Sequence, residues 1–157
     1  MPKNFESQFG QIDQLLSEVE QSPDFKALFS SVDSMCDEID QAVRSRKDEV
    51  EGWPVERKRK EAVDSEDEYV LNLLSMDEKL TIRTLSACNP NIPSASLRRL
   101  AEGATDYVRM VIANNPSVSH DVLDRIAELS GEQEVLDAVK NNPNVSKVTR
   151  YKIENRL

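Results

Sequence analysis

The sequence predicts an all-α protein in which an N-terminal helical hairpin is followed by a short α-solenoid of about three helical repeats. Three observations lead to this fold class. Apolar residues in the first half recur at alternating spacings of four and three, and strand signals are nearly absent. In the second half an Asn-Pro dipeptide recurs in one frame, with its prolines 26 and then 27 residues apart, at Asn89-Pro90, Asn115-Pro116 and Asn142-Pro143. A fixed period of this length is typical of a repeat architecture.

Each repeat is predicted to consist of a helix, a tight turn and a second helix. Apolar residues at i, i+3 and i+4 mark both helices, as in the run that begins at Val108. Proline disfavours a helical conformation in the residue before it, so the first helix should stop at or near the asparagine of each Asn-Pro pair. Ser119 and Ser146 are the expected N-caps of the second helices, and Ser94 takes this role in the first repeat.

The N-terminal region is predicted to form two antiparallel helices. Two runs of apolar residues have the spacing at which one helix packs lengthwise on another. The runs are Phe5, Phe9, Ile12, Leu16 and Val19, and then Leu28, Val32, Met35 and Ile39. Serine followed by Pro23 favours a helix start, so helix one should end near Gln21 and helix two should run from Pro23 to about Gly52.

These patterns divide the chain into three parts: an acidic helical hairpin at 1–52, a charged connector at 53–65 and the repeat solenoid at 66–157. The expected units of the solenoid lie at about 66–90, 91–116 and 117–143, with a C-terminal cap at 144–157. The last unit departs from the shared frame, as a capping repeat does because its outer face meets water.

A helix is also expected just before the first Asn-Pro pair. Ser65 and Glu68 fit a capping box, in which the serine and the glutamate each bond an amide at the helix start. The apolar residues that follow stand where the second helix of a repeat would stand. Residues 66–76 are therefore predicted to be the second helix of an incomplete leading unit.

Charge differs between the two halves of the chain. Residues 1–79 hold 10 Lys and Arg against 20 Asp and Glu, a net of −10, whereas residues 80–157 hold 10 against 9, a net of +1. A strongly acidic half repels nucleic acid and membrane phosphate and steers basic partners toward it. The candidate residues for such a partner are Asp33, Asp37, Glu38 and Asp40. Acidic faces also serve solubility, which is the simpler interpretation.

The sequence offers no set of residues for catalysis or for a cofactor. His120 is the only histidine and is expected in an exposed first turn, while Cys36 and Cys88 stand in unlike contexts that favour free thiols in a reducing compartment. We therefore expect no catalytic residue, no metal ligand and no cofactor, and a protein that is not an enzyme. No apolar run long enough for a bilayer and no signal segment are present, so a cytoplasmic protein without membrane contact is expected.

Repeated arginines form the one basic pattern with a regular spacing. Two ladders are expected along the solenoid, one from Arg83 and Arg109 and the other from Arg99 and Arg125. Such a ladder could follow the phosphates of a nucleic acid. The favoured interpretation is that the arginines support neighbouring units, because glutamates occur in the matching frame. A basic run at 57–60 is flanked by glutamates and is interpreted as a solvated helix face.

The run Tyr107 to Pro116, followed by Ser117-Val118-Ser119 and by Leu123 to Ala127, resembles the leucine-rich repeat variant family, as does the run from Ile82 to Pro93. The resemblance covers about residues 66–157. It implies a right-handed superhelix of alternating α and 3₁₀ helices and a role in binding, not chemistry. The units here are longer than the family's typical unit, which leaves room for a full second α-helix. The cysteine cluster that holds an iron-sulfur centre in one member is missing, so that cofactor is not implied.

These observations predict a protein-binding adaptor or inhibitor that uses the solenoid face and the acidic hairpin. One alternative is a helical-repeat protein that binds nucleic acid through its arginines. Another is an acidic mimic of nucleic acid that blocks a DNA-binding protein by capturing its basic surface. Self-association through the seam of Phe5, Phe9 and Ile12 is a further expectation, giving a homo-oligomer through the N-terminal hairpin.

Overall fold

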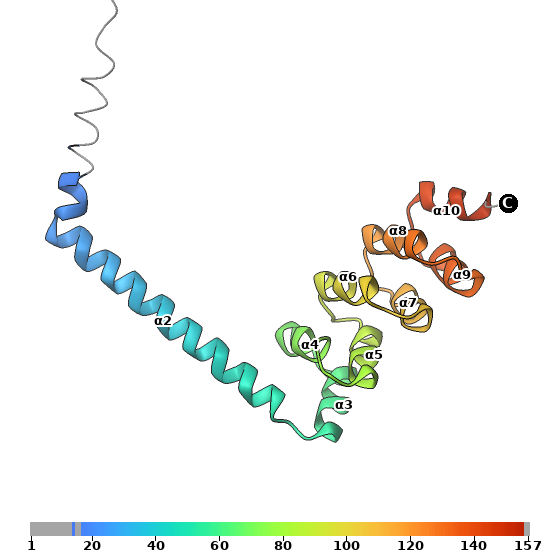
Figure 1. Ribbon diagram of the computed structural model, residues 1–157, viewed down its shortest axis with the longest axis horizontal. Helices are drawn as coiled ribbons and strands as arrows, with labels where there is room; N and C mark the ends of the chain where they lie inside the picture. Colours follow the sequence, from blue (N-terminus) through green and yellow to red (C-terminus); the bar gives the residue numbers. More distant parts are fainter. Residues whose placement is uncertain (1–13, 15–16, 156–157) are drawn as a thin grey trace, which may run out of the picture. The chain divides into compact units, whose positions relative to one another are not determined.

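The computed structural model describes residue 14 and residues 17–155 and confirms the all-α prediction (Figure 1). Over that range every regular element is a helix. The helices are α2 (Pro23–Glu51), α3 (Val55–Asp64), α4 (Glu68–Leu74), α5 (Leu80–Cys88), α6 (Ser94–Glu102), α7 (Asp106–Ala113), α8 (His120–Leu129), α9 (Gln133–Asn141) and α10 (Lys147–Glu154). The chain divides into two compact units, Met1–Arg46 and Lys47–Leu157.

Helix α2 begins and ends where the sequence predicts. Ser22 accepts a hydrogen bond from the amide of Phe25 at 3.1 Å, which satisfies one of the free donors at the helix start. The helix ends at Glu51, just before Gly52 and Pro54. Residues 17–21 before it are helical, but most of the first predicted hairpin helix, with Phe5, Phe9 and Ile12, lies outside the described residues. The hairpin therefore stays a prediction.

The second unit is a solenoid of two helix layers, and this confirms the predicted architecture. Helices α3, α5, α7 and α9 follow one another in one layer, and α4, α6, α8 and α10 stack beside them (Figure 1). An apolar core runs between the layers, with Leu97, Ile112, Leu123 and Ile126 fully buried. The shared apolar frame of the repeats is thus the set of side chains that each unit buries against its neighbours.

Residues 53–65, predicted as a connector, hold a packed helix instead. Helix α3 contacts both α4 and α5, and its Ala62 is fully buried. It pairs with α4, so the leading unit that was expected to be incomplete has both helices. The last turn of α2 also reaches this core, because Val50 packs with Ala62 and Ile82. Residues 56–61 are all charged, so the sequence of α3 shows no apolar pattern from which its buried face could be predicted.

Two helix starts differ from their predicted caps. The cap of α4 is Asp67, whose Oδ1 accepts hydrogen bonds from the amides of Tyr69 and Val70, so the predicted capping box at Ser65 does not form. Helix α6 starts after Pro93, which makes Ser94 its first residue. Proline already has a fixed φ that suits the residue before a helix start or its first position. Ser119 and Ser146 stand at the predicted N-cap positions, but only Ser146 caps with its side chain, whose hydroxyl accepts a hydrogen bond from the amide of Thr149 at 3.1 Å.

The asparagine of each Asn-Pro pair links its unit to the one before. The amide Nδ2 of Asn115 donates to the carbonyl oxygens of Ala87 at 2.8 Å and Asn89 at 2.9 Å. Asn142 repeats this pattern one unit later, donating to Ala113 at 2.8 Å and Asn115 at 3.0 Å. All three asparagines are buried. Ala87 and Ala113 lie in the last turns of α5 and α7, where carbonyls have no partner within the helix.

The same asparagines also shape their own turns. Oδ1 of Asn115 accepts a hydrogen bond from the amide of Ser117 at 2.7 Å, and Asn89 and Asn142 bond the residue two places on in the same way. This is an Asx turn, which suits the proline between the two residues. Ser65 occupies the equivalent place in the leading unit: its hydroxyl accepts from the amide of Asp67, and its carbonyl accepts from Asn89 at 3.0 Å. We call the three asparagines, Asn89, Asn115 and Asn142, together with Ser65 at the equivalent place, the asparagine ladder.

Replacing Asn115 with alanine is expected to destabilise the solenoid by about 2–4 kcal/mol, because two buried carbonyls and one amide lose their partner. Chemical denaturation followed by circular dichroism measures this change. The matched control is Asn114→Ala at the neighbouring exposed position, where the side chain bonds only a carbonyl of its own helix. That variant should change the free energy of unfolding by less than about 0.5 kcal/mol. Equal effects of the two substitutions would contradict the inter-unit role.

Candidate protein-interaction surfaces

Arg99 and Arg125 each reach back to the preceding unit. The guanidinium of Arg99 donates to Oδ1 of Asn72 at 3.0 Å and to Oγ of Ser75 at 2.8 Å. Arg125 holds Glu102 through two bonds of 2.8 and 3.1 Å, a bidentate geometry, and also bonds Glu128. Its hydrogen bond and charge lower the pKa of the Glu102 carboxyl. Both arginines therefore contact the preceding unit, Arg99 through Nη2 and Arg125 through Nε and Nη2, as the interpretation that they support neighbouring units predicted.

Arg83 and Arg109, the other predicted pair, donate hydrogen bonds to backbone carbonyls. Nη1 of Arg83 donates to the carbonyl oxygens of Asp77 at 2.7 Å and Glu78 at 3.0 Å. Arg109 donates from Nε to the carbonyl of Ala101 at 3.2 Å and from Nη1 to Asp106. Each arginine thereby ties the start of its own repeat to the end of the previous one. These hydrogen bonds again use the guanidinium to join successive repeats.

A partly buried ion pair joins α3 to the loop after α4. Nζ of Lys58 lies 2.8 Å from Oδ2 of Asp77, and the two side chains are only 15% and 6% exposed. Burial raises the pKa of the Asp77 carboxyl, but the hydrogen bonds from Lys58 and from the amide of Lys79, with their charges, leave that pKa below its ordinary value. Lys58 belongs to the basic run at 57–60, so this member of the run is not on a solvated face.

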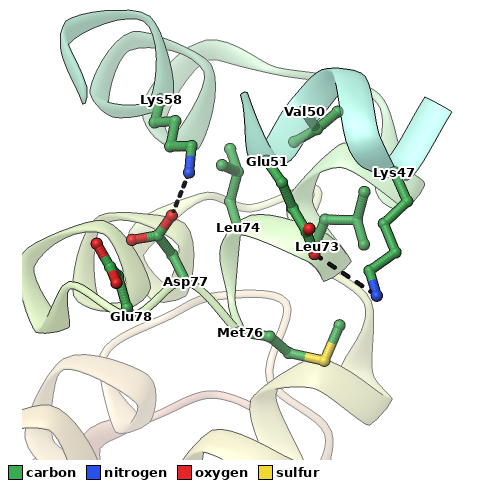
Figure 2. Close-up of a pocket in the computed structure, with 9 residues that line it drawn as sticks. All are labelled: Lys47, Val50, Glu51, Lys58, Leu73, Leu74, Met76, Asp77 and Glu78. Atoms are coloured by element: carbon green, nitrogen blue, oxygen red, sulfur yellow. Dashed lines mark hydrogen bonds and ion pairs between the residues drawn. The ribbon is translucent and has the colours of Figure 1, made fainter. Parts of the chain in front are cut away.

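A cleft of about 450 Å³ opens beside this ion pair (Figure 2). Leu73, Leu74 and Met76 form an apolar wall, and the Lys58–Asp77 pair lies on the opposite side from the Lys47–Glu51 pair. The four charged groups of these pairs neutralise one another, and Glu78 adds one negative charge to the lining. The cleft therefore offers apolar surface with a net charge of −1, and it lacks a convergent acid, base and nucleophile.

The predicted acidic residues are all exposed on α2. Asp33, Asp37 and Asp40 recur at i, i+4 and i+7, so they share one face of the helix. Glu38 lies on the other side of the apolar seam, by the same helical geometry. The structure thus separates one of the four predicted residues from the other three.

Within the solenoid, the two residues considered for chemistry lie on different helices: His120 begins α8 and Cys88 ends α5. Cys36 belongs to the other compact unit. Partial burial raises the pKa of the Cys88 thiol, which disfavours its reactive thiolate form. Among residue 14 and residues 17–155, no group of three His, Cys, Asp or Glu side chains could hold a metal ion. No described helix has the length and apolar character needed to cross a bilayer.

Comparison with protein families adds one match, over the middle of the solenoid. Residues 83–143 match the Leucine Rich Repeat Variant domain, from the first turn of α5 to the last Asn-Pro pair. The match confirms the resemblance based on the Asn-Pro frame. The comparisons with curated proteins and with solved structures found no match. The domain is a helical repeat of a class suited to protein interaction.

The free energy of unfolding should fall at acid pH, and part of this fall should come from protonation of the Asp77 carboxylate. Its lowered pKa means that the native state holds the carboxylate more strongly than the unfolded chain does, so its contribution is present above the ordinary value of 3.8 and is lost as pH falls below it. At pH 7, Asp77→Asn should cost about 1.5–3 kcal/mol. That difference from wild type, measured by denaturant unfolding, should shrink below pH 3.8. A constant difference across this range would contradict the pairing.

Neighbouring arginines on α6 provide a second test. Arg99→Met should lower the free energy of unfolding by about 1 kcal/mol, because it removes the bonds to Asn72 and Ser75. Arg98→Met removes the same charge from an exposed position and should change stability by less than about 0.5 kcal/mol. Thermal and denaturant unfolding of both variants measure the effect. Indistinguishable variants would show that the inter-unit contact contributes nothing.

Proposed function

We propose that this protein is a non-enzymatic protein-binding adaptor or inhibitor, with the outer surface of its solenoid and the acidic face of α2 as its binding surfaces. The proposal is supported most by the way the solenoid uses its polar groups. Its repeated arginines are bonded to the neighbouring unit or to backbone, and its buried asparagines bond successive turns. A stack held in this way presents a broad fixed surface, and helical repeats use such surfaces to bind other macromolecules.

The chemistry of α2 favours a basic protein as the partner. Asp33, Asp37 and Asp40 expose three carboxylates on one helix face. The first 79 residues of the chain carry a net charge of −10. Such a face raises the association rate of a positively charged partner and repels phosphate. The same face would serve an inhibitor that occupies the basic surface of a DNA-binding protein.

Nucleic acid is the less favoured partner, because the arginines that would contact phosphates already have partners. Arg99 and Arg125 bond neighbouring side chains, and Arg83 and Arg109 bond backbone carbonyls. Turning them toward a phosphate would break contacts between units. A protein that binds through phosphates shows a steep loss of affinity with salt.

Affinity capture from a nuclease-treated cell extract tests the proposal with the full chain as bait. We expect a basic protein to be retained at moderate salt and lost when Asp33, Asp37 and Asp40 are all changed to Asn. The matched control changes three exposed glutamates of the solenoid to Gln, at Glu66, Glu134 and Glu154. This control should retain the partner, because it removes equal charge from three separate positions of the solenoid that do not form an acidic face.

Electrophoretic mobility shift with mixed DNA and RNA fragments gives the opposing outcome. The proposal predicts no retardation even at low salt. Retardation that disappears steeply with salt, and that Arg99→Met or Arg125→Met weakens, would favour nucleic-acid binding instead. If the partner is retained equally well after the three aspartates are changed, the acidic face of α2 is not part of the binding surface.

A further inference from the structure

Helix α2 carries an apolar stripe that is exposed along most of its length. Leu28, Val32, Met35 and Ile39 are between 48% and 64% exposed. Phe25 and Phe29 lie at the start of the same stripe, with ring centroids 5.4 Å apart. Single exposed apolar residues are ordinary on a protein surface, but a continuous stripe on one helix marks an interaction face.

The stripe follows the heptad pattern of a two-stranded coiled coil. Phe25, Val32 and Ile39 occupy one of the two core positions of the heptad, and Leu28, Met35 and Ala42 occupy the other. The aspartates at 33, 37 and 40 fall outside both positions. A helix that presents such a seam buries it against a second helix of the same kind.

From this seam we infer that the protein forms a homodimer in which α2 pairs with α2 of a second copy in antiparallel orientation. A two-fold axis makes the contacts reciprocal, so residue i of one copy meets residue j of the other, and j meets i. One register opposes every core residue to another core residue. It sets Val32 against Met35, Leu28 against Ile39 and Phe25 against Ala42.

The sizes of the opposed side chains suit this register. The largest core residue, Phe25, lies opposite the smallest, Ala42, so the two together fill about the volume of an ordinary layer. The inner layers oppose aliphatic side chains of similar size. In a parallel pair each residue would meet itself, which would place two phenylalanines in one layer and two alanines in another.

The charges along the helix select the same orientation. The antiparallel register sets residues 44–47, which contain three basic residues and no acidic one, opposite residues 20–23, beside Glu20 and Asp24. The acidic residues Asp48, Glu49 and Glu51 follow this basic segment, so the charge complementarity is confined to it. A parallel pair would align like charges at both ends, which is destabilising. The carboxylates of Asp33, Asp37 and Asp40 stay on the outer side of the pair.

Light scattering and sedimentation of the full chain test the dimer. We expect a mass of twice 17.8 kDa for the wild type. Val32→Asp should reduce it to the mass of one chain, because it places a charge in the seam. The matched control, Ser34→Asp, adds the same charge on the polar side and should stay dimeric. A single-chain mass for the wild type at all soluble concentrations would overturn the proposal, and would leave residues 5–16 of the same chain as the cover of the stripe.

Cross-linking tests the orientation without relying on a destabilising variant. In a background with Cys36→Ser and Cys88→Ser, chains with Leu28→Cys and chains with Ile39→Cys are treated with a short bis-maleimide, separately and mixed. The antiparallel register predicts a strong cross-linked band only in the mixture, because Leu28 meets Ile39, whereas identical positions of the two copies lie about 16 Å apart along the helices. Cross-linking within each separate sample and none between the two would establish a parallel pair and overturn the inferred orientation.

Discussion

The buried side-chain amide of the Asn-Pro asparagine is the interaction on which the rest of the solenoid depends. A helix that stops before a proline leaves carbonyls in its last turn without partners, and burial makes such groups costly. The next unit supplies the missing donor: Asn115 bonds Ala87 and Asn89, as Asn142 bonds Ala113 and Asn115. Each unit therefore satisfies the backbone of the one before it. In the described part of the chain, no buried side-chain nitrogen or oxygen lacks a hydrogen bond.

This arrangement explains what many polar groups of the solenoid do. Arg99 and Arg125 are bonded across units, and Lys58 is paired with Asp77. These groups fix the spacing and rotation of successive helix pairs. Under the proposed function, partner recognition falls to the outer surface of the stack and to the long helix α2, whose polar and apolar faces are separated.

The period of Asn-Pro was enough to predict helix pairs, their turns and their stacking, because proline acts on local backbone geometry. It could not predict the contacts of the asparagine, since that side chain bonds residues 24 to 29 positions earlier in the sequence. The packing of helix α3 against the solenoid could not be predicted for a related reason. The leading turn has Ser65 in place of asparagine and lacks proline, so the repeat signal is absent, and the charges of 56–61 conceal the buried Ala62.

The role of the arginines was easier to predict than the helix caps. Glutamates in the matching frame predicted that the arginines support neighbouring units, and Arg125 bonds Glu102 and Glu128, whereas Arg99 contacts the preceding unit through Asn72 and Ser75. The starts of α4 and α6 depended on competition between adjacent candidates, Ser65 with Asp67 and Pro93 with Ser94. The difference between such candidates is small in energy and is decided by tertiary packing, which one sequence does not display.

Hydrogen exchange of asparagine side-chain amides, followed by NMR, tests the central claim most directly. The account predicts that the Nδ2 protons of Asn89, Asn115 and Asn142 exchange slowly, with the global unfolding of the stack, because each is buried and bonded to the preceding unit. The exposed Asn114 and Asn155 provide the reference for rapid exchange. If the three ladder amides exchange as fast as these two, the units are not joined by their asparagines and the account is wrong.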